Sequence, residues 1–407
     1  MPARHPGVTR VGSLPGSVTG AAGRVGWLED WRVGAALLAV ALAVAAGWVV
    51  LAVRGRRPGH PVLRRVGLGA LVTLVALAGT GVVVNSYAGY APDVASLVRS
   101  APSLVGARDT GPTTVDVGGT GSTGSRYPAR LFSLRLSDPA DRIPPGRAWV
   151  YLPAGYSDPA DAHRRYPVGY LLHGYPGSSY DWFGAGRLAT SVALLQREEL
   201  LRPMILVAPD ISGGHGRDTE CLDSSIGGPR LETFLTRTVV DTVDRRYRTL
   251  ADRSDRVLGG VSAGAFCALN LGLRHQQEFG VLLGLLPYGD PGRDADQIMF
   301  HGDPRLVRLN SPDQYVATLP MPAPPAVFLS ANLGDREVDA TVESLGRELA
   351  GRGVRVGVRV DPAGLGHTWK EARREVPYAL VFASSHLARP PAPVPAAPTP
   401  MGPLDRT

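Results

Sequence analysis

The sequence of 407 residues contains very little lysine and cysteine. Of its 43 basic residues only Lys370 is a lysine, and Cys221 and Cys267 are its only cysteines. A phosphate-binding P-loop needs a lysine directly after glycine, whereas Lys370 follows Trp369, so this class of nucleotide site is excluded. Neither cysteine has a histidine or a second cysteine at the spacing of a zinc site. We therefore predict no metal and no cofactor.

Charge is also scarce, since 19% of the residues are charged and 44% are hydrophobic. This balance excludes a mainly disordered chain. The formal net charge of +7 arises within residues 1–110, which hold 11 basic and 4 acidic side chains, whereas the rest of the chain holds 32 of each. A neutral main body has no general attraction for phosphate, so we predict no nucleic-acid partner.

Two long uncharged runs lie in this first quarter, over residues 33–53 and 66–84. At about 1.5 Å per residue, each run spans or nearly spans a hydrocarbon layer roughly 30 Å thick. Such length without a polar face favours membrane helices over buried helices of a soluble protein. A paired arrangement behind a 32-residue leader also argues against a signal peptide. We expect a two-helix membrane anchor over residues 33–84.

The segment that joins these runs, residues 54–65, contains five arginines and no acid. Short arginine-rich loops stay in the cytoplasm. With two spans, the N-terminal tail over residues 1–32 and everything after the second span then lie outside. Four arginines in the tail oppose this orientation, but Glu29 and Asp30 partly offset them. We expect a multi-pass protein of the cell membrane with an extracytoplasmic main domain.

Composition sets the remaining boundaries. Residues 85–125 are rich in Gly, Ser, Thr, Pro and Ala, which is typical of a flexible linker. Residues 389–407 hold seven prolines in nineteen positions, and we expect a disordered or extended tail.

The domain between them, residues 126–388, alternates short apolar runs with helix-like stretches. This alternation predicts an α/β domain with a mostly parallel sheet and helices on both faces. The strand-like runs are residues 131–136, 147–152, 168–172, 204–208, 257–261, 281–286, 327–331 and 354–360.

The pentapeptide Gly260-Val261-Ser262-Ala263-Gly264 fits G-x-S-x-G and joins an apolar run to a helix-like stretch. This strand–turn–helix context is that of a nucleophile elbow, whose turn is too tight for side chains at the glycines. A serine hydroxyl there becomes a nucleophile when a positioned base takes its proton. We predict Ser262 as the nucleophile, against the alternative of a surface serine in a glycine-rich turn.

Four histidines follow this serine in the chain. His367 lies in the sequence GLGHTW just after the last strand-like run, where the flanking glycines let a loop carry the ring over the sheet edge. His275 lies on the helix after the elbow, and His386 lies near the C-terminal tail. His301, in a proline-rich insertion over residues 286–325, is the weaker competitor. We predict His367 as the base.

The acid of such a site lies between the serine and the histidine, after a strand. Asp335 stands just past the run at 327–331, where a carboxylate can reach the far ring nitrogen of His367 and stabilise the imidazolium. Glu337 and Asp339 are close enough to compete, and the helix dipole also favours acids at a helix start. We predict Asp335 as the acid, with Glu337 as the alternative.

The sequence His173-Gly174-Tyr175-Pro176-Gly177 follows the run at 168–172. An H-G-x-x-G turn at this position supplies one backbone N–H of an oxyanion hole. The predicted donor is the N–H of Tyr175, since Pro176 has none, and the second is the N–H of Ala263. His173 is expected to be a structural residue of the turn.

These motifs together resemble the esterase family that contains esterase D, feruloyl esterases and the cell-wall mycolyltransferases. The likeness rests on HGYPG with the following Asp181-Trp182, on GVSAG, on the acid site and on GLGHTW, and it covers roughly residues 126–387. The G-H-x-W element followed by Pro377-Tyr378-Ala379-Leu380 is the most specific part. The resemblance implies an α/β-hydrolase fold that acts on acyl esters by hydrolysis or acyl transfer.

Carried over residue by residue, the resemblance assigns the triad to Ser262, Asp335 and His367. It assigns the oxyanion donors to Tyr175 and Ala263. Some members of the family place the acid one or two residues further along, which leaves Glu337 open.

Two features stay undecided in the sequence. Residues 213–221 form either one wall of the active site or a plain polar loop. Cys221 and Cys267 form a disulfide, as is typical of an exported pair, or remain two thiols, since Cys267 lies on a buried helix.

We therefore expect a membrane-anchored extracytoplasmic serine esterase acting on a small-molecule or lipid acyl ester. One alternative is a cell-envelope acyltransferase, in which residues 286–325 wall an acyl pocket. The other is a binding protein that kept the fold without turnover, against which the intact serine, acid and histidine argue.

Overall fold

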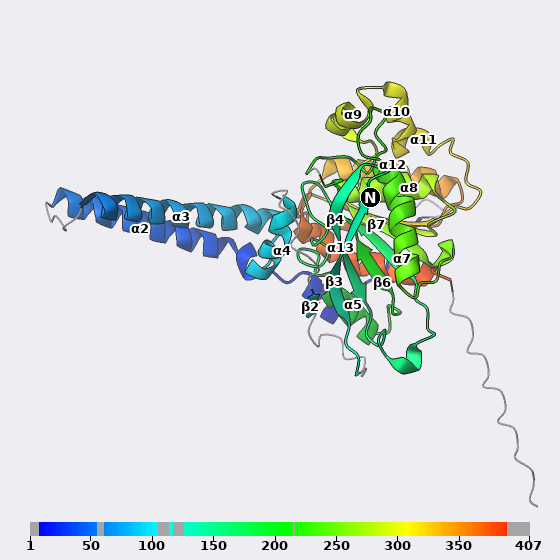
Figure 1. Ribbon diagram of the computed structural model, residues 1–407, viewed down its shortest axis with the longest axis horizontal. Helices are drawn as coiled ribbons and strands as arrows, with labels where there is room; N and C mark the ends of the chain where they lie inside the picture. The colour runs from blue at the N-terminus through cyan, green and yellow to red at the C-terminus, as the bar shows by residue number, and fades with distance from the viewer. Residues whose placement is uncertain (1–7, 55–60, 105–113, 117–125, 215, 389–407) are drawn as a thin grey trace, which may run out of the picture.

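The computed structural model describes residues 8–54, 61–104, 114–116, 126–214 and 216–388. Within this part of the chain, a globular α/β domain carries a long two-helix hairpin that projects from it (Figure 1). The predicted tail at 389–407 lies outside the described residues, as do parts of the predicted linker and of the arginine-rich loop.

One sheet runs through the domain, with its strands in the order β1-β10-β9-β8-β7-β5-β6-β4-β3-β2. The neighbours from β1 to β6 pair in parallel, and β4, β3 and β2 extend the sheet in antiparallel fashion. The strands are β1 (Val8–Arg10), β2 (Thr114–Asp116), β3 (Arg130–Asp138), β4 (Ile143–Leu152), β5 (Val168–Leu172), β6 (Ile205–Ala208), β7 (Arg256–Val261), β8 (Val281–Leu285), β9 (Ala326–Asn332) and β10 (Val356–Asp361). Each predicted strand-like run forms one of these strands.

Helices cover both faces of the sheet. Neighbouring residues of a strand point to opposite faces. On β9, the ring of Phe328 lies 5.7 Å from that of Phe382 on α13 (Trp369–His386), whereas Leu329 lies beside Gly346 on α12 (Arg336–Gly351). Helix α8 (Ala263–Arg274) packs on β5, β7 and β8, and α5 (Leu188–Arg197) packs on α13. The mostly parallel sheet between two helical layers confirms the predicted fold class.

Shorter helical segments complete the domain. The insertion before β9 contains helices rather than irregular chain, and these lie together at one side of the domain (Figure 1). The segments are α1 (Gly16–Ala22), η1 (Trp27–Glu29), η2 (Pro159–Asp161), α6 (Leu231–Thr233), η3 (Phe234–Val239), α7 (Val240–Arg246), η4 (Arg253–Asp255), α9 (Gly292–Phe300), α10 (Pro304–Leu309) and α11 (Pro312–Tyr315).

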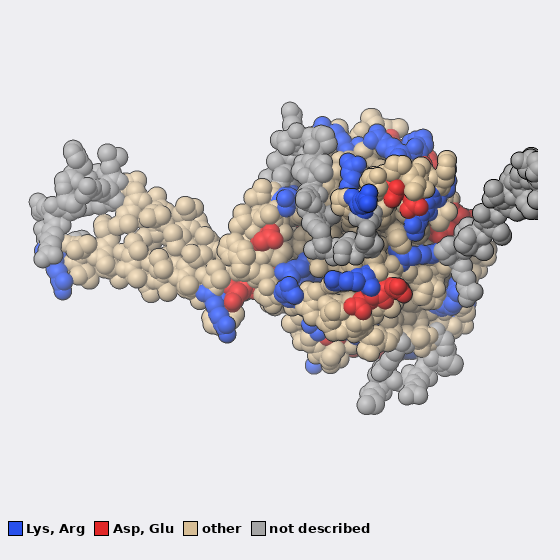
Figure 2. All heavy atoms as spheres, turned by 90° about the horizontal axis from the view of Figure 1, so that it is seen from below, with Lys and Arg blue, Asp and Glu red and all other residues tan. Residues whose placement is uncertain are grey.

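The projecting hairpin consists of α2 (Trp31–Val53) and α3 (Pro61–Ala88). The two helices approach closely at glycines, because a Cβ built on Gly34 would lie 2.8 Å from the carbonyl oxygen of Gly79. Only 11% of the most apolar window of each helix is buried. Between its tip and its base, the face in Figure 2 shows no charged side chain on the hairpin. A core helix of a soluble protein would be mostly buried, so these helices are not of that kind.

The N-terminal tail is part of the globular domain, which the sequence did not predict. β1 adds a parallel strand beside β10, and α1 packs on α5 and α13. Glu29 is fully buried and accepts two hydrogen bonds from Arg373 on α13, at 2.6 and 3.0 Å. Since the tail precedes α2 and the domain follows α3, both ends of the hairpin are attached to the same body.

Part of the predicted flexible linker also forms a helix, α4 (Val94–Leu104), at the base of the hairpin (Figure 1). The hydroxyl of Ser100 donates a 3.0 Å hydrogen bond to the buried carboxylate of Asp181 in the domain. A side-chain contact over 81 residues cannot be recognised from composition, which explains the difference from the expected linker.

The buried pair of Glu29 and Arg373 gives a stability prediction. Replacing Glu29 by Gln leaves the Arg373 charge buried without a countercharge, so we expect a loss of roughly 3–5 kcal/mol of unfolding free energy. Thermal unfolding of the full chain in detergent measures it. The double variant E29Q/R373Q should regain part of the loss, because the Arg373 charge is removed together with its partner, and only Arg187, 18% exposed, still loses its 3.7 Å contact with Glu29. Glu198→Gln is the matched control, since this exposed carboxylate holds only Ser17. Equal melting temperatures for the Glu29 and Glu198 variants would contradict the assignment.

Candidate active site

Ser262 occupies a sharp turn between β7 and α8, with φ 57° and ψ −122°. A Cβ built on Gly260 would lie 1.8 Å from the carbonyl oxygen of Gly264, and one built on Gly264 would lie 2.1 Å from that of Leu172. Only glycine fits at both positions, and the strained backbone turns the serine side chain out of the sheet. The sequence motif therefore has the strand–turn–helix form expected for it.

A chain of two hydrogen bonds leads away from this hydroxyl. The Nε2 atom of His367 lies 2.7 Å from Ser262 Oγ, and Nδ1 lies 3.1 Å from Oδ2 of Asp335. The His367 ring is 37% exposed and the Asp335 side chain 18%, so the imidazole stands at the surface while its carboxylate partner is more enclosed. The structure brings together the three residues that the sequence selected.

The competing candidates lie elsewhere. Glu337 is exposed on the first turn of α12, while Asp335 caps that helix by accepting the N–H of Val338 at 3.1 Å. His301 ends α9 in the insertion, and His275 pairs with Glu232 at 2.7 Å. His386 turns back on the last turn of its own helix α13. Asp335, rather than Glu337, is the carboxylate that contacts the His367 ring.

Asn332 is a residue of this site that sequence reasoning missed. Its fully buried side chain donates from Nδ2 to the carbonyl of Gly366 at 3.2 Å and accepts the N–H of Gly334 at 2.9 Å. It thereby ties the loop of Asp335 to the loop of His367. An asparagine directly before a predicted acid loop was the available signal.

The H-G-x-x-G turn lies against the nucleophile. A Cβ built on Gly174 would be 3.3 Å from Cβ of Ser262. His173 is fully buried, with Nδ1 2.8 Å from the carbonyl of Gly174 and Nε2 3.3 Å from Asp210, so it holds the turn to the end of β6. Tyr175, the predicted oxyanion donor, follows directly, and the predicted second donor, Ala263, is the first residue of α8.

Cys221 and Cys267 form a disulfide, which settles the alternative that the sequence left open. The bond ties the loop at 213–221 to α8, five residues after the predicted nucleophile. Beside it, Tyr288 donates to the buried Glu220. Burial, with the nearby charge of Asp218, raises the pKa of Glu220 well above its ordinary value.

A group of buried carboxyls lies beneath the His367 loop, formed by Asp361, Glu371 and Glu375. Arg374 pairs with Asp361 at 2.7 Å, and Arg359 pairs with Glu375 at 2.9 Å. Burial raises the pKa of Glu371 to about 7 and that of Glu375 to about 8. Glu371 also accepts the N–H of Leu365 at 3.3 Å, two residues before His367. The two arginines and the raised pKa values of Glu371 and Glu375 both reduce the net negative charge of this group.

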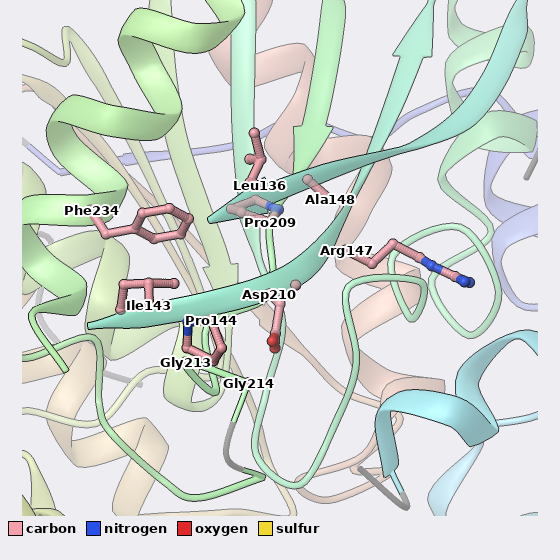
Figure 3. A pocket seen from close by; sticks show the side chains of 11 residues that line it. Leu136, Ile143, Pro144, Arg147, Ala148, Pro209, Asp210, Gly213, Gly214 and Phe234 are labelled. Carbon is pink, nitrogen blue, oxygen red and sulfur yellow. The ribbon is translucent and has the colours of Figure 1, made fainter. Parts of the chain in front are cut away.

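A small pocket lies between β4 and the segment at 209–214, and its lining does not include Ser262, His367 or Asp335 (Figure 3). The carboxylate of Asp210 lies among its lining residues, with Pro144 and Gly214 close by. Its volume of about 10 Å³ has room for one water molecule at most. It is not a substrate site.

With this geometry established, comparisons with known proteins become informative. Residues 146–322 match the family model described as "Putative esterase". We call the domain that contains these residues the esterase domain. The match makes it a carboxylic ester hydrolase, which confirms the predicted enzyme class.

Curated relatives agree with this family. An uncharacterized protein of Corynebacterium glutamicum is 25% identical over 320 residues, which cover 70% of this chain and 72% of that protein. An endo-1,4-beta-xylanase/feruloyl esterase of Xylanibacter ruminicola is 31% identical over 144 residues, 34% of this chain and 19% of that protein. An esterase of Mycobacterium tuberculosis is 29% identical over 169 residues, 36% of this chain and 33% of that protein. For the last two, the chain spans less than two thirds of the relative.

Solved structures show the same fold as the esterase domain. A ferulic acid esterase aligns with TM-score 0.54 at 21% identity, covering 65% of this chain and all of that one. An S-formylglutathione hydrolase from Agrobacterium tumefaciens aligns with TM-score 0.52 at 15% identity, covering 65% and 98%.

The raised pKa of Glu371 gives a pH prediction. The folded esterase domain holds this proton more tightly than the unfolded chain, so the stabilisation is complete below about pH 4.3 and is lost as the pH rises through about 7. Glu371→Gln removes the titration, so its melting temperature should fall less between pH 5 and pH 8, by several degrees, than that of the unchanged chain. Glu343→Gln, an exposed carboxylate paired with Arg347, should keep the original slope. The idea fails if all three proteins show one slope.

Proposed function

We propose that the esterase domain is a serine esterase in which Ser262 is the nucleophile, His367 the base and Asp335 the acid. The observation that carries this proposal is the continuous chain of bonds from Ser262 Oγ through both ring nitrogens of His367 to Asp335. A carboxylate on Nδ1 fixes the tautomer with Nε2 free to accept, and Nε2 lies within proton-transfer distance of the serine.

The first half of the reaction forms an acyl-enzyme. As Ser262 Oγ bonds to the ester carbonyl carbon, its proton passes to Nε2 of His367, and Asp335 stabilises the resulting imidazolium. The backbone N–H groups of Tyr175 and Ala263 are the donors to the carbonyl oxygen as it becomes negative. The bond to the alcohol then breaks, and the alcohol leaves with the proton from His367.

The second half releases the acyl group. A water molecule gives its proton to His367 Nε2 and attacks the acyl carbon, and the serine oxygen leaves with the proton returned to it. An acceptor alcohol in place of water would make the same chemistry a transfer. Both products arise from the same acyl-enzyme, so the acyltransferase alternative concerns the acceptor rather than the triad.

Substitution of the triad tests this assignment on p-nitrophenyl butyrate. Ser262→Ala should lower kcat at least about 1,000-fold, and Asp335→Asn about 100- to 10,000-fold, because the wrong tautomer is then held. Glu337→Gln, the matched carboxylate that faces solvent, should stay within about two-fold. The full chain is needed, because residues 8–32 belong to the domain. Equal rates for Ser262→Ala and the unchanged chain would contradict the mechanism. A larger loss of kcat for Glu337→Gln than for Asp335→Asn would assign the acid to Glu337. Added glycerol separates transfer from hydrolysis by its acylated product.

The proposal further holds that α2 and α3 are membrane spans and that the esterase domain is extracytoplasmic. The exposed hairpin, which has no charged side chain over residues 33–53 and 66–84, supports the spans, since water would solvate so much apolar surface poorly. Two crossings of the membrane bring both ends of the hairpin to the same side, which agrees with their attachment to one domain. The arginine-rich segment at 54–65 favours a cytoplasmic tip. The disulfide fits an oxidising compartment.

Reporter fusions test this orientation. A reporter that is active only in the cytoplasm should stay inactive when it is fused after Thr407. The same reporter should be active when it is fused after Arg57 of a truncated chain that contains only the first span. A periplasm-type phosphatase at the same two points should give the opposite pattern. Cytoplasmic activity at Thr407 would reverse the orientation.

A further inference from the structure

The base of the hairpin, where α3 meets the domain, contacts the His367 loop. The hydroxyl of Tyr87, one residue before the end of α3, lies 3.3 Å from a Cβ built on Gly366. Lys370, just after the loop, donates to the carbonyl of Ser86 on α3 and, at 3.4 Å, to that of Glu29. The loop that carries the base is therefore held directly against the helix end.

The turn after α3 and helix α4 contact the oxyanion loop in the same way. Tyr90 donates from its hydroxyl to the carbonyl of Pro176 at 2.6 Å, directly after Tyr175. Further along, Ser100 on α4 binds Asp181, whose other oxygen accepts the N–H of Ser178 at 2.8 Å. Both loops of the candidate site thus meet the base of the hairpin.

Exposed apolar side chains surround this junction. We call this set of side chains the apolar rim. Its members lie on the loops of the candidate site, at the end of α3 or on α4. The rim consists of Tyr87, Leu97, Val98, Tyr175, Leu333 and Leu365, which are between 38% and 71% exposed. The loops that carry Leu333 and Leu365 adjoin, because a Cβ built on Gly334 would lie 2.6 Å from the carbonyl oxygen of Gly364. Clustered apolar exposure of this kind marks an interaction surface.

The rim is continuous with the proposed spans. α3 ends at Ala88, and Trp27 and Trp31 stand 54% and 61% exposed at the same end of the hairpin. Exposed tryptophan and tyrosine at helix ends are typical of the boundary between lipid and water. With the hairpin in a bilayer, Tyr87 and the neighbouring His367 loop lie at this boundary.

We infer that the active site faces the membrane surface and takes acyl esters of membrane-borne amphiphiles. This inference rests on the proposed esterase function and on the proposed spans. The ester carbonyl of an amphiphile lies where its apolar chain meets its polar group, which is the level of the rim. The acyl chain remains on apolar surface while the carbonyl reaches Ser262, so the substrate need not pass through water. Bond making and breaking are those of the proposed esterase reaction.

The test uses the full chain in lipid nanodiscs with two esters of one leaving group. 4-Methylumbelliferyl acetate is soluble, and 4-methylumbelliferyl oleate is placed either in the same nanodisc or in separate protein-free vesicles at equal total concentration. We expect the oleate to be cleaved at least about ten-fold faster in the same nanodisc. Equal oleate rates from the two locations, with Ser262-dependent cleavage of acetate, would overturn the inference of a membrane-facing site and leave the proposed esterase function standing. Absence of Ser262-dependent cleavage of both esters would overturn the proposed function as well.

A rim variant provides the second measurement. L97S/V98S on α4 should lower the ratio of oleate to acetate rates at least about five-fold, since it weakens contact with the lipid surface. Leu309→Ser is the matched control, because this leucine is 60% exposed on α10, far from the hairpin (Figure 1), and it should keep the ratio of the unchanged chain. All side chains changed are exposed, and melting temperatures check the fold. The same ratio for both variants would contradict the rim's role.

Discussion

The close crossing of α8 over the ends of β5 and β7 is the constraint on which the site depends. Gly260 and Gly264 have backbone atoms where any Cβ would overlap, so the helix begins immediately above the sheet. The same crossing puts Ser262 in a positive-φ conformation and leaves Gly174 in contact with it. The loops of His367 and Asp335 reach the serine because it is displayed at this edge. A larger side chain at either glycine would separate the helix from the strands and, with it, Ser262 from His367 and Asp335.

A second layer of contacts fixes the loops relative to one another. Asn332 joins the acid loop to the carbonyl of Gly366, and Glu371 holds the N–H of Leu365 from below. Both bonds hold backbone atoms of the two residues directly before His367, so buried side chains fix the loop that carries its ring. The exposure of the ring is then compatible with a defined position, since the loop is held from the interior rather than by packing around the imidazole.

Sequence patterns predicted what is local and missed what is distant. The Ser262 turn and the His367 loop could be predicted because their geometry depends on neighbouring residues in the chain. The alternation of strand-like and helix-like segments predicted the parallel sheet. Asn332 carried no motif. The Cys221–Cys267 pair stayed open between a disulfide and two thiols, because composition does not tell whether residues 46 apart in the chain come together. β1 has three residues, too few for a recognisable alternation, and it forms only beside β10.

The same limit explains why the sequence predicts an N-terminal tail separate from the domain. The contact of Glu29 with Arg373 spans 344 residues, and neither partner stands out in its own segment. Yet β1 lies at one edge of the sheet and β2 at the other, and the hairpin lies between them in the chain. The hairpin is therefore an insertion within the esterase domain rather than an appendage on its end. An appended hairpin can be removed without changing the domain, whereas this one is attached through both flanking segments, which themselves contribute a strand, a buried charge and contacts to the loops of the candidate site. Hairpin and candidate site are parts of one folded unit, and the position of the site relative to the hairpin is set by the fold rather than by a flexible linker.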